Sequence, residues 1–432
     1  MPSVRADLDD LIRIPSVSAD PAATAEVLRS ADAVAGLFAA AGLDDVQVLA
    51  MPGGAPAVVG SRPAPAGQPT ILLYAHHDVQ PPGHPAAWDS PAFEPTERGG
   101  RLYGRGAADD KAGVAAHLAA LRAYDGKPPI GVKVIIEGEE EVGSPTLEAF
   151  LGKHRDLLAA DVIVIADSSN WAIGQPALTT SLRGFADCTV EVRTLDHEVH
   201  SGMYGGAAPD ALTALCRLVA TLHDEAGNVA IDGLHSGPAA DLEYDEAQFR
   251  SDAGVLDGVE LIGTGPIVER LWTKPALAVT ALDATRVADA SNTLAPVARA
   301  HLNLRLAPGE DSAAAMAALE RHLVDHAPWG AHVTIVEREH GAPSSIDAVG
   351  PAYDAARSAF HEAWGVRPVD IGIGGSIPFI AAFAAAYPDA AILVTGVGDP
   401  DERAHGVNEG LHLAEFEKVC LAEALLLQHL VR

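Results

Sequence analysis

The stretch TILLYAHHD, residues 70–78, begins as an unbroken apolar run and ends in two histidines and an aspartate. Three more short apolar runs occur at VKVIIE (132–137), VIVIA (162–166) and AAILVTG (390–396). Continuous apolar runs of this length are typical of strands that are buried on both faces of a parallel sheet. The first two runs are separated by DDKAGVAAHLAALRAY (109–124), whose apolar residues have helical spacing. The sequence therefore predicts an α/β fold with a mostly parallel sheet.

The middle of the chain has a different pattern. ADCTVEVRT (186–194) and ARAHLNLRLAP (298–308) alternate polar and apolar residues, as antiparallel strands with one solvated face do. Two helical patterns accompany them, DALTALCRLVATLHD (210–224) and DSAAAMAALERHLVDH (311–326). These segments predict a second domain of the α+β class. Residues 226–270, rich in Gly, Asp and Glu, have no pattern that assigns them to helix or strand.

The length of the chain agrees with two domains. Its 432 residues are too many for one ordinary domain, and a hydrophobic content of 48% is enough for a large core. We therefore predict that residues 1–181 and 342–432 form one domain. The second domain, at 182–341, is predicted to be inserted into the first.

The charge of the chain bears on its possible partners, and its cysteine content and apolar runs bear on its cellular compartment. A formal net charge of -30 argues against nucleic acid or an anionic membrane as the main partner, because both require a basic surface. Only three cysteines occur, without a CxxC motif, so a reducing compartment is expected. The N-terminal segment lacks the apolar region of a signal peptide, and no apolar run is long enough to span a membrane. These features predict a cytoplasmic protein.

Acidic and imidazole side chains follow each predicted buried strand. Ligands of open α/β sheets bind at the carboxyl ends of the strands, so these side chains are expected at one edge of the sheet. A further pair of aspartates opens the helix that follows the first strand. The residues are His76, His77 and Asp78; Glu139, Glu140 and Glu141; Asp167; His405; and Asp109 with Asp110.

Each of these residues has an ordinary interpretation by itself. Asp109 or Asp110 could cap a helix, Asp167 could be a turn residue, and His405 a surface histidine. Together, however, clustered carboxylates repel one another unless cations neutralise them. A mixed set of oxygen and imidazole ligands suits zinc, manganese or cobalt, whereas calcium or magnesium prefers oxygen alone. The set is large enough for two ions that share one ligand, an arrangement that recurs in hydrolases.

Six motifs occur in order along the chain: YAHHDVQPP, GRGAADDKAG, EGEEEVGS, HSGMYGG, GGSIP and HGVNE. Through these motifs the chain resembles the M20 metallopeptidase family, and most of all its carnosinase-like dipeptidase branch. The resemblance implies a mostly parallel-sheet, di-metal catalytic domain with an inserted α+β lid and dimerisation domain. It implies hydrolysis of dipeptides; the alternatives are an N-acyl-amino-acid deacylase of the same family and a catalytically silent, metal-stabilised scaffold.

The resemblance also implies a metal-ligand set. His76 and Asp167 match the ligands of one ion, and Glu141 and His405 match those of the other. Asp109 matches the residue that bridges the two ions. The expected cofactors are two divalent ions per chain, with zinc favoured and manganese or cobalt possible.

Three neighbouring positions carry further implied roles. Asp78 matches the residue that orients His76 through its other ring nitrogen. Glu140 matches the general base that acts on the metal-bridging water, and Glu139 is expected to be a solvated or supporting residue. The peptide bond Asp109–Asp110 matches one that is cis in the family.

The inserted domain is expected to contribute to the reaction from a second subunit. His200 matches a histidine that stabilises the oxyanion in the neighbouring subunit's site, so a homodimer through the lid domain is implied. From the residues alone, the favoured interpretation of His200 is an entry residue of the following helix. Asn292 matches a second polar contact, but Ala295 stands where the family has proline and Pro296 follows.

The remaining implied contacts concern a small peptide substrate. Arg305 matches the residue that binds the substrate carboxylate, although an arginine on a strand is also a common partner in cross-strand ion pairs. Ser376 matches a residue near the same carboxylate. GIGGS (372–376) lacks the GxGxxG pattern, so no dinucleotide site is expected there.

Overall fold

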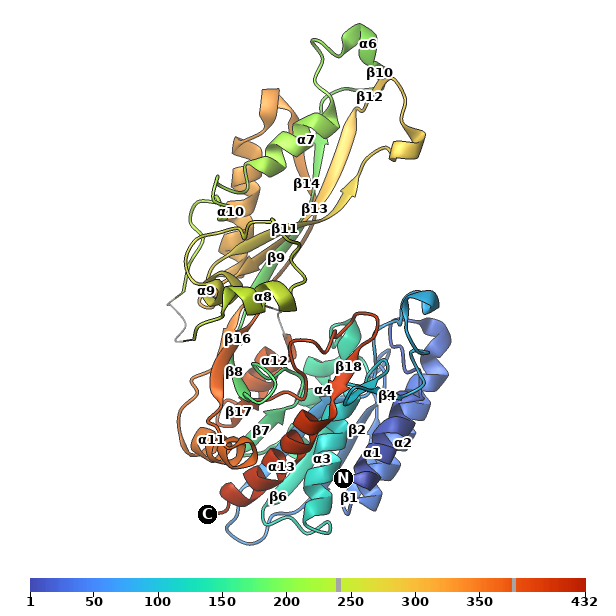
Figure 1. The fold of residues 1–432 in the computed structure, drawn as a ribbon, viewed down its shortest axis with the longest axis vertical. Helices are drawn as coiled ribbons and strands as arrows, with labels where there is room; N and C mark the ends of the chain where they lie inside the picture. The colour runs from blue at the N-terminus through green and yellow to red at the C-terminus, as the bar shows by residue number, and fades with distance from the viewer. Residues whose placement is uncertain (238–241, 375–377) are drawn as a thin grey trace. The chain divides into compact units, whose positions relative to one another are not determined.

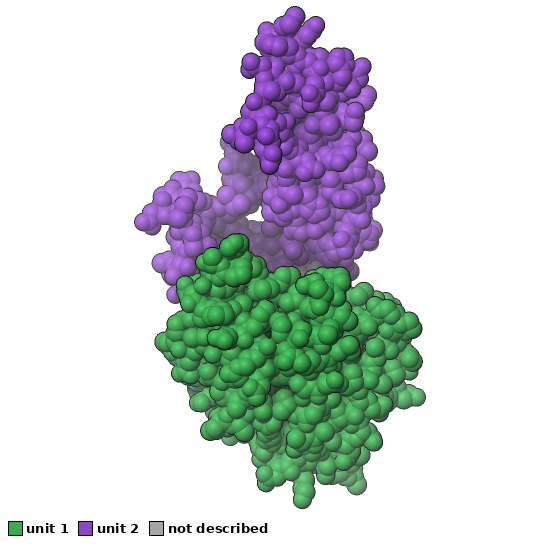
Figure 2. All heavy atoms as spheres, turned by 90° about the vertical axis from the view of Figure 1, so that its right-hand side faces the viewer, with its two compact units in different colours: residues 1–180, 346–371, 378–432 green, residues 181–345, 372–377 purple. Residues whose placement is uncertain are grey.

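The structure is a computed structural model that describes residues 1–237, 242–374 and 378–432. The chain divides into two compact units, coloured separately in Figure 2. Unit 1 comprises Met1–Thr180, Ile346–Ile371 and Pro378–Arg432. Unit 2 comprises Ser181–Ser345 together with Gly372–Ile377, of which 375–377 are not described.

A mixed sheet organises unit 1 (Figure 1). Its centre consists of four neighbouring parallel strands, in the order β6 (Gly131–Glu137), β3 (Thr70–His76), β7 (Val162–Ile165) and β17 (Ala391–Val394). These are the four apolar runs of the sequence, and the expected α/β class with a mostly parallel centre is confirmed. Antiparallel strands follow on either side: β2 (Ala57–Arg62) and β1 (Asp44–Leu49) beyond β6, and β8 (Ala177–Leu182) and β15 (Ser344–Ser345) beyond β17, with β16 (Val369–Ile373) paired to β8.

Successive side chains of β3 point to opposite faces of the sheet and pack against different residues. Ile71 and Leu73 belong to the main core of unit 1, whereas the ring of Tyr74 stacks on Phe379 with centroids 4.6 Å apart. This alternation is the normal consequence of strand geometry. The main core is built with helices α2 (Thr24–Ala40), α3 (Lys111–Ala123), α11 (Pro351–Trp364) and α13 (Leu413–His429). The other helices and strands of unit 1 are α1 (Pro2–Ile12), α4 (Leu147–Lys153), α5 (Arg155–Leu158), α12 (Pro378–Ala386), β4 (Thr96–Arg98), β5 (Arg101–Tyr103) and β18 (Gly410–His412).

Unit 2 contains a four-stranded antiparallel sheet. Its order is β11 (Ala276–Asp283), β13 (Val297–Leu306), β9 (Gly184–Arg193) and β14 (His332–Gly341). One face packs on α7 (Ala211–Ala220) and α10 (Ser312–Asp325), and the inward residues of β9 and β13 are buried at every second position. The alternating pattern of these two strands therefore separates a helix-covered face from a polar one.

The rest of unit 2 consists of short elements. A two-stranded ribbon pairs β10 (Val199–His200) with β12 (Thr293–Leu294), and α6 (Ser201–Tyr204) follows β10 directly. The stretch that the sequence left unassigned contains α8 (Glu246–Asp252) and the start of α9 (Ile267–Trp272). Among the described residues, no helix combines the length and the apolar character needed to cross a membrane. The three cysteines are free.

Candidate metal centre

Five segments of unit 1 bring acidic and histidine side chains together. His76 is the last residue of β3, and Asp167 lies two residues beyond β7. Glu140 and Glu141 lie in a short 3₁₀ turn, η3 (Glu140–Val142), that follows β6. Asp109 precedes α3, and His405 lies in the loop after β17. We call these six residues, His76, Asp109, Glu140, Glu141, Asp167 and His405, the acid–histidine cluster.

The cluster contains two triads that share Asp109. His76, Asp109 and Asp167 offer ligand atoms within 4.8 Å of one another, and so do Asp109, Glu141 and His405. The two carboxylate oxygens of Asp109 point to different histidines: Oδ1 lies 3.1 Å from Nε2 of His76, and Oδ2 lies 3.0 Å from Nε2 of His405. This geometry fits two cations bridged by one carboxylate.

The electrostatics of the cluster favour bound cations. Burial, and then the charge of Asp167, raise the pKa of Glu140 to about 9. Burial likewise raises the pKa of Asp167 to about 7, although the nearby His76 opposes the shift. Hydrogen bonds to Asp109 and Glu141 raise the pKa of His405 to about 10. Buried carboxylates that resist ionisation in this way are stabilised as anions by divalent ions, so the donor set fits a metal centre.

Asp78 holds the backbone of Glu140 and Glu141 in place. Its carboxylate oxygens accept the backbone N–H groups of Glu140 at 3.2 Å and of Glu141 at 3.1 Å. Its Oδ1 also lies 3.4 Å from Nδ1 of His76, whose closest acceptor is the carbonyl oxygen of Asp78 at 3.1 Å. Burial raises the pKa of Asp78, but the interactions with His76 outweigh it and the net shift is downward. Asp78 therefore contacts both His76 and the start of η3.

Glu139, the first residue of the acidic run, is buried rather than solvated. Its carboxylate accepts the backbone N–H of Ala55 at 2.7 Å and both the N–H and the hydroxyl of Thr146, at 2.8 and 2.6 Å. Glu139 therefore ties the turn that carries Glu140 and Glu141 to Ala55 and Thr146.

Two residues that support the cluster were not singled out from the sequence. The side chain of Gln80 donates to Glu141 Oε2 at 2.7 Å, and its backbone N–H donates to Oε1 at 3.0 Å. Glu409, at the end of the HGVNE motif, accepts the backbone N–H groups of Ala108 and Asp109 at 2.9 and 3.1 Å. Its place in that motif was the only sequence signal. The Asp109–Asp110 peptide bond is cis, as the resemblance implied.

His200 and Asn292 lie side by side in unit 2. His200 opposes Thr293 across the β10–β12 ribbon, and the N–H of Ser201 donates to the carbonyl oxygen of Asn292 at 2.8 Å. Both side chains are exposed. Nδ1 of His200 accepts the N–H of Gly202 at 3.1 Å, and Nε2 has no hydrogen-bond partner in the described part of the chain.

The departure from the family pattern at Ala295 has a local explanation. The backbone N–H of Ala295 donates to Oδ2 of Asp210 at 2.8 Å, while Oδ1 of the same side chain caps α7 by accepting the N–H of Thr213. A proline at position 295 has no N–H and could not make this bond. The Asp210 carboxylate thus joins the segment after Asn292 to the start of α7.

Arg305 lies on β13, and its Nε donates to Oδ1 of Asn303 at 3.0 Å. Among residues 1–237, 242–374 and 378–432 it forms no ion pair, so the structure gives no support to a cross-strand ion-pair role. Ser376, the other residue matched to the substrate carboxylate, lies outside the described residues.

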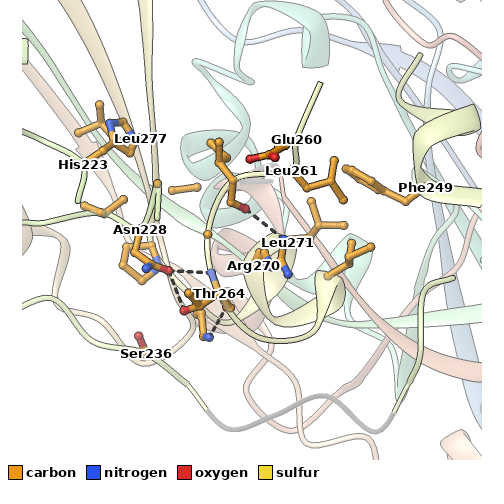
Figure 3. A pocket seen from close by; sticks show the side chains of 18 of the residues that line it. His223, Asn228, Ser236, Phe249, Glu260, Leu261, Thr264, Arg270, Leu271 and Leu277 are labelled. Atoms are coloured by element: carbon orange, nitrogen blue, oxygen red, sulfur yellow. Dashed lines mark hydrogen bonds between the residues drawn. The ribbon is translucent and has the colours of Figure 1, made fainter. Parts of the chain in front are cut away.

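A separate cavity lies within unit 2 (Figure 3). Its volume is about 590 Å³, and its walls come from the chain between His223 and Leu277. Asn228 is held at one side by hydrogen bonds from the N–H and hydroxyl of Thr264, at 2.9 and 3.0 Å. No residue of the acid–histidine cluster lines this cavity, so the cavity is not part of the candidate metal centre.

Comparisons with known proteins agree with the motifs. The model of peptidase family M20/M25/M40 matches residues 72–429. A cysteinylglycine-S-conjugate dipeptidase of Corynebacterium striatum is 40% identical over 374 residues, covering 85% of this chain and 82% of the relative. A Cys-Gly metallodipeptidase of Schizosaccharomyces pombe is 26% identical, with 95% of this chain and 92% of the relative covered.

The fold is also similar to that of a solved peptidase structure. Human carnosine dipeptidase 1 superposes with a TM-score of 0.84 at 25% sequence identity, over 99% of this chain and 96% of that one. The similarity therefore covers both units, as the resemblance in sequence motifs did. The chain belongs to peptidase family M20/M25/M40, as its six motifs predicted.

Proposed function

We propose that this protein is a di-metal dipeptidase. The observation that carries the proposal is the pair of triads that share Asp109, with one histidine on each side of its carboxylate. The names of the relatives, a cysteinylglycine-S-conjugate dipeptidase and a Cys-Gly metallodipeptidase, support the choice of a dipeptide as substrate.

The proposed metal ligands are the five residues that the resemblance to the M20 family implied. His76 and Asp167 would hold one divalent ion, Glu141 and His405 the other, and Asp109 both. Zinc is favoured, because its usual ligands are imidazole and carboxylate groups such as these, and manganese or cobalt accept the same set. When bound, a pair of such ions polarises the scissile carbonyl group and lowers the pKa of a water molecule between them.

Glu140 is the proposed general base. Its Oε2 lies 3.9 Å from Nε2 of His76, and its side chain is one-fifth exposed, so Glu140 lies beside the two triads without being a member of either. A carboxylate in this place can remove a proton from the attacking water and return it to the amine that leaves. Asp78 supports this role, because it holds the backbone of Glu140.

Unit 2 is proposed to supply the oxyanion contact from a second chain. The imidazole of His200 is exposed, and its Nε2 has no hydrogen-bond partner among the residues that the structure describes. Met203 and Tyr204 in the adjacent α6 are 74% and 51% exposed. Exposed apolar side chains beside a free polar group are typical of an association surface. We therefore include a homodimer, with His200 and Asn292 acting across it, in the proposal.

Arg305 is proposed to bind the carboxylate of the dipeptide. A guanidinium group recognises a carboxylate through two parallel hydrogen bonds, which fix its orientation as well as its charge. An enzyme with this contact should prefer free dipeptides to their C-terminal amides.

The test is a substrate panel of free dipeptides, their C-terminal amides, and N-acetyl and N-succinyl amino acids. We expect the highest kcat/KM for free dipeptides. Higher kcat/KM for the N-acyl amino acids would replace the proposal with a deacylase, and no turnover of any substrate by the metal-loaded protein would favour a silent scaffold.

A further inference from the structure

Arg305 has an unusual set of neighbours for an arginine on a strand. Its cross-strand partners are Ala276 on β11 and Phe185 on β9, and neither side chain offers a hydrogen-bond acceptor. Its Nε donates to Oδ1 of Asn303 at 3.0 Å, and this is its one side-chain hydrogen bond within the described residues. The guanidinium is therefore held at one corner by a neutral amide.

Asn303 is itself fixed by a carboxylate. It opposes Asp187 directly across the β9–β13 pair, and its Nδ2 donates to both oxygens of Asp187 at 2.8 Å. Only the NH₂ end of an amide can donate to a carboxylate, so these bonds direct Oδ1 of Asn303 toward Arg305. Asp187 has His301 at 3.9 Å and Glu339 as its register partner on β14. The order Asp187–Asn303–Arg305 places a neutral group between the acid and the base.

The charge of Arg305 consequently stays uncompensated. In the described part of the chain, no carboxylate lies within ion-pair distance of Arg305. By contrast, Arg299, which lies six residues earlier on the same face of β13, forms an ion pair with Glu191 at 2.6 Å. A second cation is affected by its charge: Arg183 is buried, and burial followed by the charge of Arg305 lowers the pKa of Arg183 to about 10. Two arginines thus act on each other here without an ion-pair partner in the described part of the chain, which favours the binding of an anion.

We propose that Asn303 is a positioning residue that aims the Arg305 guanidinium at the substrate carboxylate without neutralising it. This inference rests on the proposed function, in which Arg305 binds that carboxylate. A guanidinium has five N–H donors, and Asn303 occupies the one on Nε. The four N–H groups on Nη1 and Nη2 remain for the ligand. The substrate carboxylate would therefore bind end-on, with one hydrogen bond from each of the two terminal nitrogens.

The neutrality of Asn303 is what the inference requires. An aspartate in its place would keep an acceptor for Nε but would also form an ion pair with Arg305. That pair would compete with the incoming carboxylate for the same guanidinium. Position 303 therefore requires a side chain that accepts a hydrogen bond, as Asp and Asn both do, but that carries no charge, as only Asn does.

The decisive variant exchanges the two residues, D187N together with N303D. The exchange keeps the net charge and an amide–carboxylate pair across the same two strands, but it moves the carboxylate next to Arg305. The measurement is the ratio of kcat/KM for a free dipeptide to that for its C-terminal amide, with the melting temperature as a control for folding. R305A is measured in parallel, and R299Q serves as the matched control because its guanidinium is already paired with an acid.

We expect R305A and the exchange to lose most of the preference for the free dipeptide, and R299Q to keep it. N303A should raise KM for the free dipeptide about 10-fold, as expected for one hydrogen bond to a charged group, with little change in kcat because ground state and transition state lose the same contact. If R305A loses the preference but the exchange retains it, the role of Asn303 is refuted and the proposed function stands. If R305A retains the preference, both the role of Arg305 and this inference are refuted.

Discussion

Arg105 and Glu409 form a fully buried ion pair, with Nη1 of Arg105 2.6 Å from Oε2 of Glu409. Each partner also holds a different segment of the metal centre. Glu409 accepts the N–H groups of Ala108 and Asp109, and Arg105 donates to the carbonyl oxygen of His405 at 3.1 Å. The pair thus connects the loop that carries Asp109, which both triads share, to the loop that carries His405.

Glu409→Gln should therefore weaken both the fold and the metal centre. Removal of one partner leaves a buried charge unpaired, which typically costs about 3–5 kcal/mol of unfolding free energy. The expected results are a lower free energy of unfolding in urea and a loss of bound metal on gel filtration. Glu26→Gln is the control, because its ion pair with Arg29 is exposed and such pairs contribute about 0–1 kcal/mol. Unchanged metal content in Glu409→Gln would show that the pair does not support the centre.

Glu140 and Glu141 should respond differently to the same isosteric change. Glu140→Gln removes the proposed base but no ligand, so metal content should persist while kcat falls by about 10²–10⁴-fold. Glu141→Gln removes a charged member of one triad and should lower metal content. Elemental analysis and turnover of both variants check the prediction, and the reverse assignment would mean that the roles within the acidic run are wrong by one position.

Subunit sharing predicts that two inactive variants restore activity when they form mixed dimers. His200→Ala and Glu140→Gln chains, mixed under conditions that allow exchange, should form some dimers in which one site has both residues. The measurement is activity against the fraction of heterodimer, determined with differently tagged chains. Heterodimers without activity would exclude the action of His200 across the dimer.

The His117–Glu423 pair predicts a pH dependence of stability away from the metal centre. His117 is buried, and its Nδ1 lies 2.7 Å from Oε1 of Glu423. Burial lowers the pKa of His117, but the charge of Glu423 and its hydrogen bond outweigh it, so the net shift is upward. A raised folded-state pKa means that the protonated histidine contributes stability fully below its unfolded pKa of about 6.5. That contribution is lost as the pH rises through the higher folded-state value.

The measurement is the difference in unfolding free energy between the wild type and Glu423→Gln as a function of pH. The difference should be largest below about pH 6.5 and should decrease above it. Comparison of the two proteins at each pH removes effects common to both, including those of the metal ligands. A difference that is constant with pH would mean that Glu423 does not raise the pKa of His117.

The fold class and the members of the cluster could be predicted from the sequence for one physical reason. Parallel strands end at the same edge of a sheet, so residues at the ends of β3, β6 and β7 or within a few positions after them are expected to lie close together. His76, Glu141 and Asp167 are such residues, and the structure brings them together with Asp109 and His405. Position relative to a strand end is local information, which a single sequence contains.

The supporting residues could not be predicted in the same way. Glu409 contacts Asp109 across 300 residues of chain, and Asn303 contacts Asp187 across 116. The alternation of β13 indicates that Asn303 is on the polar face, but no local pattern identifies the partner across the sheet. Residues 226–270 have no pattern that assigns them, because α8 (Glu246–Asp252), the complete helix that the structure describes there, is too short to show periodicity.

The central claim is that one carboxylate, Asp109, holds two divalent ions. Elemental analysis of metal-saturated protein after gel filtration tests it most directly. We expect two ions per chain in the wild type, about one in His76→Ala and in His405→Ala, and close to none in Asp109→Asn, because both triads share that residue. One ion per chain in a fully active wild type, or two ions retained by Asp109→Asn, would contradict the account.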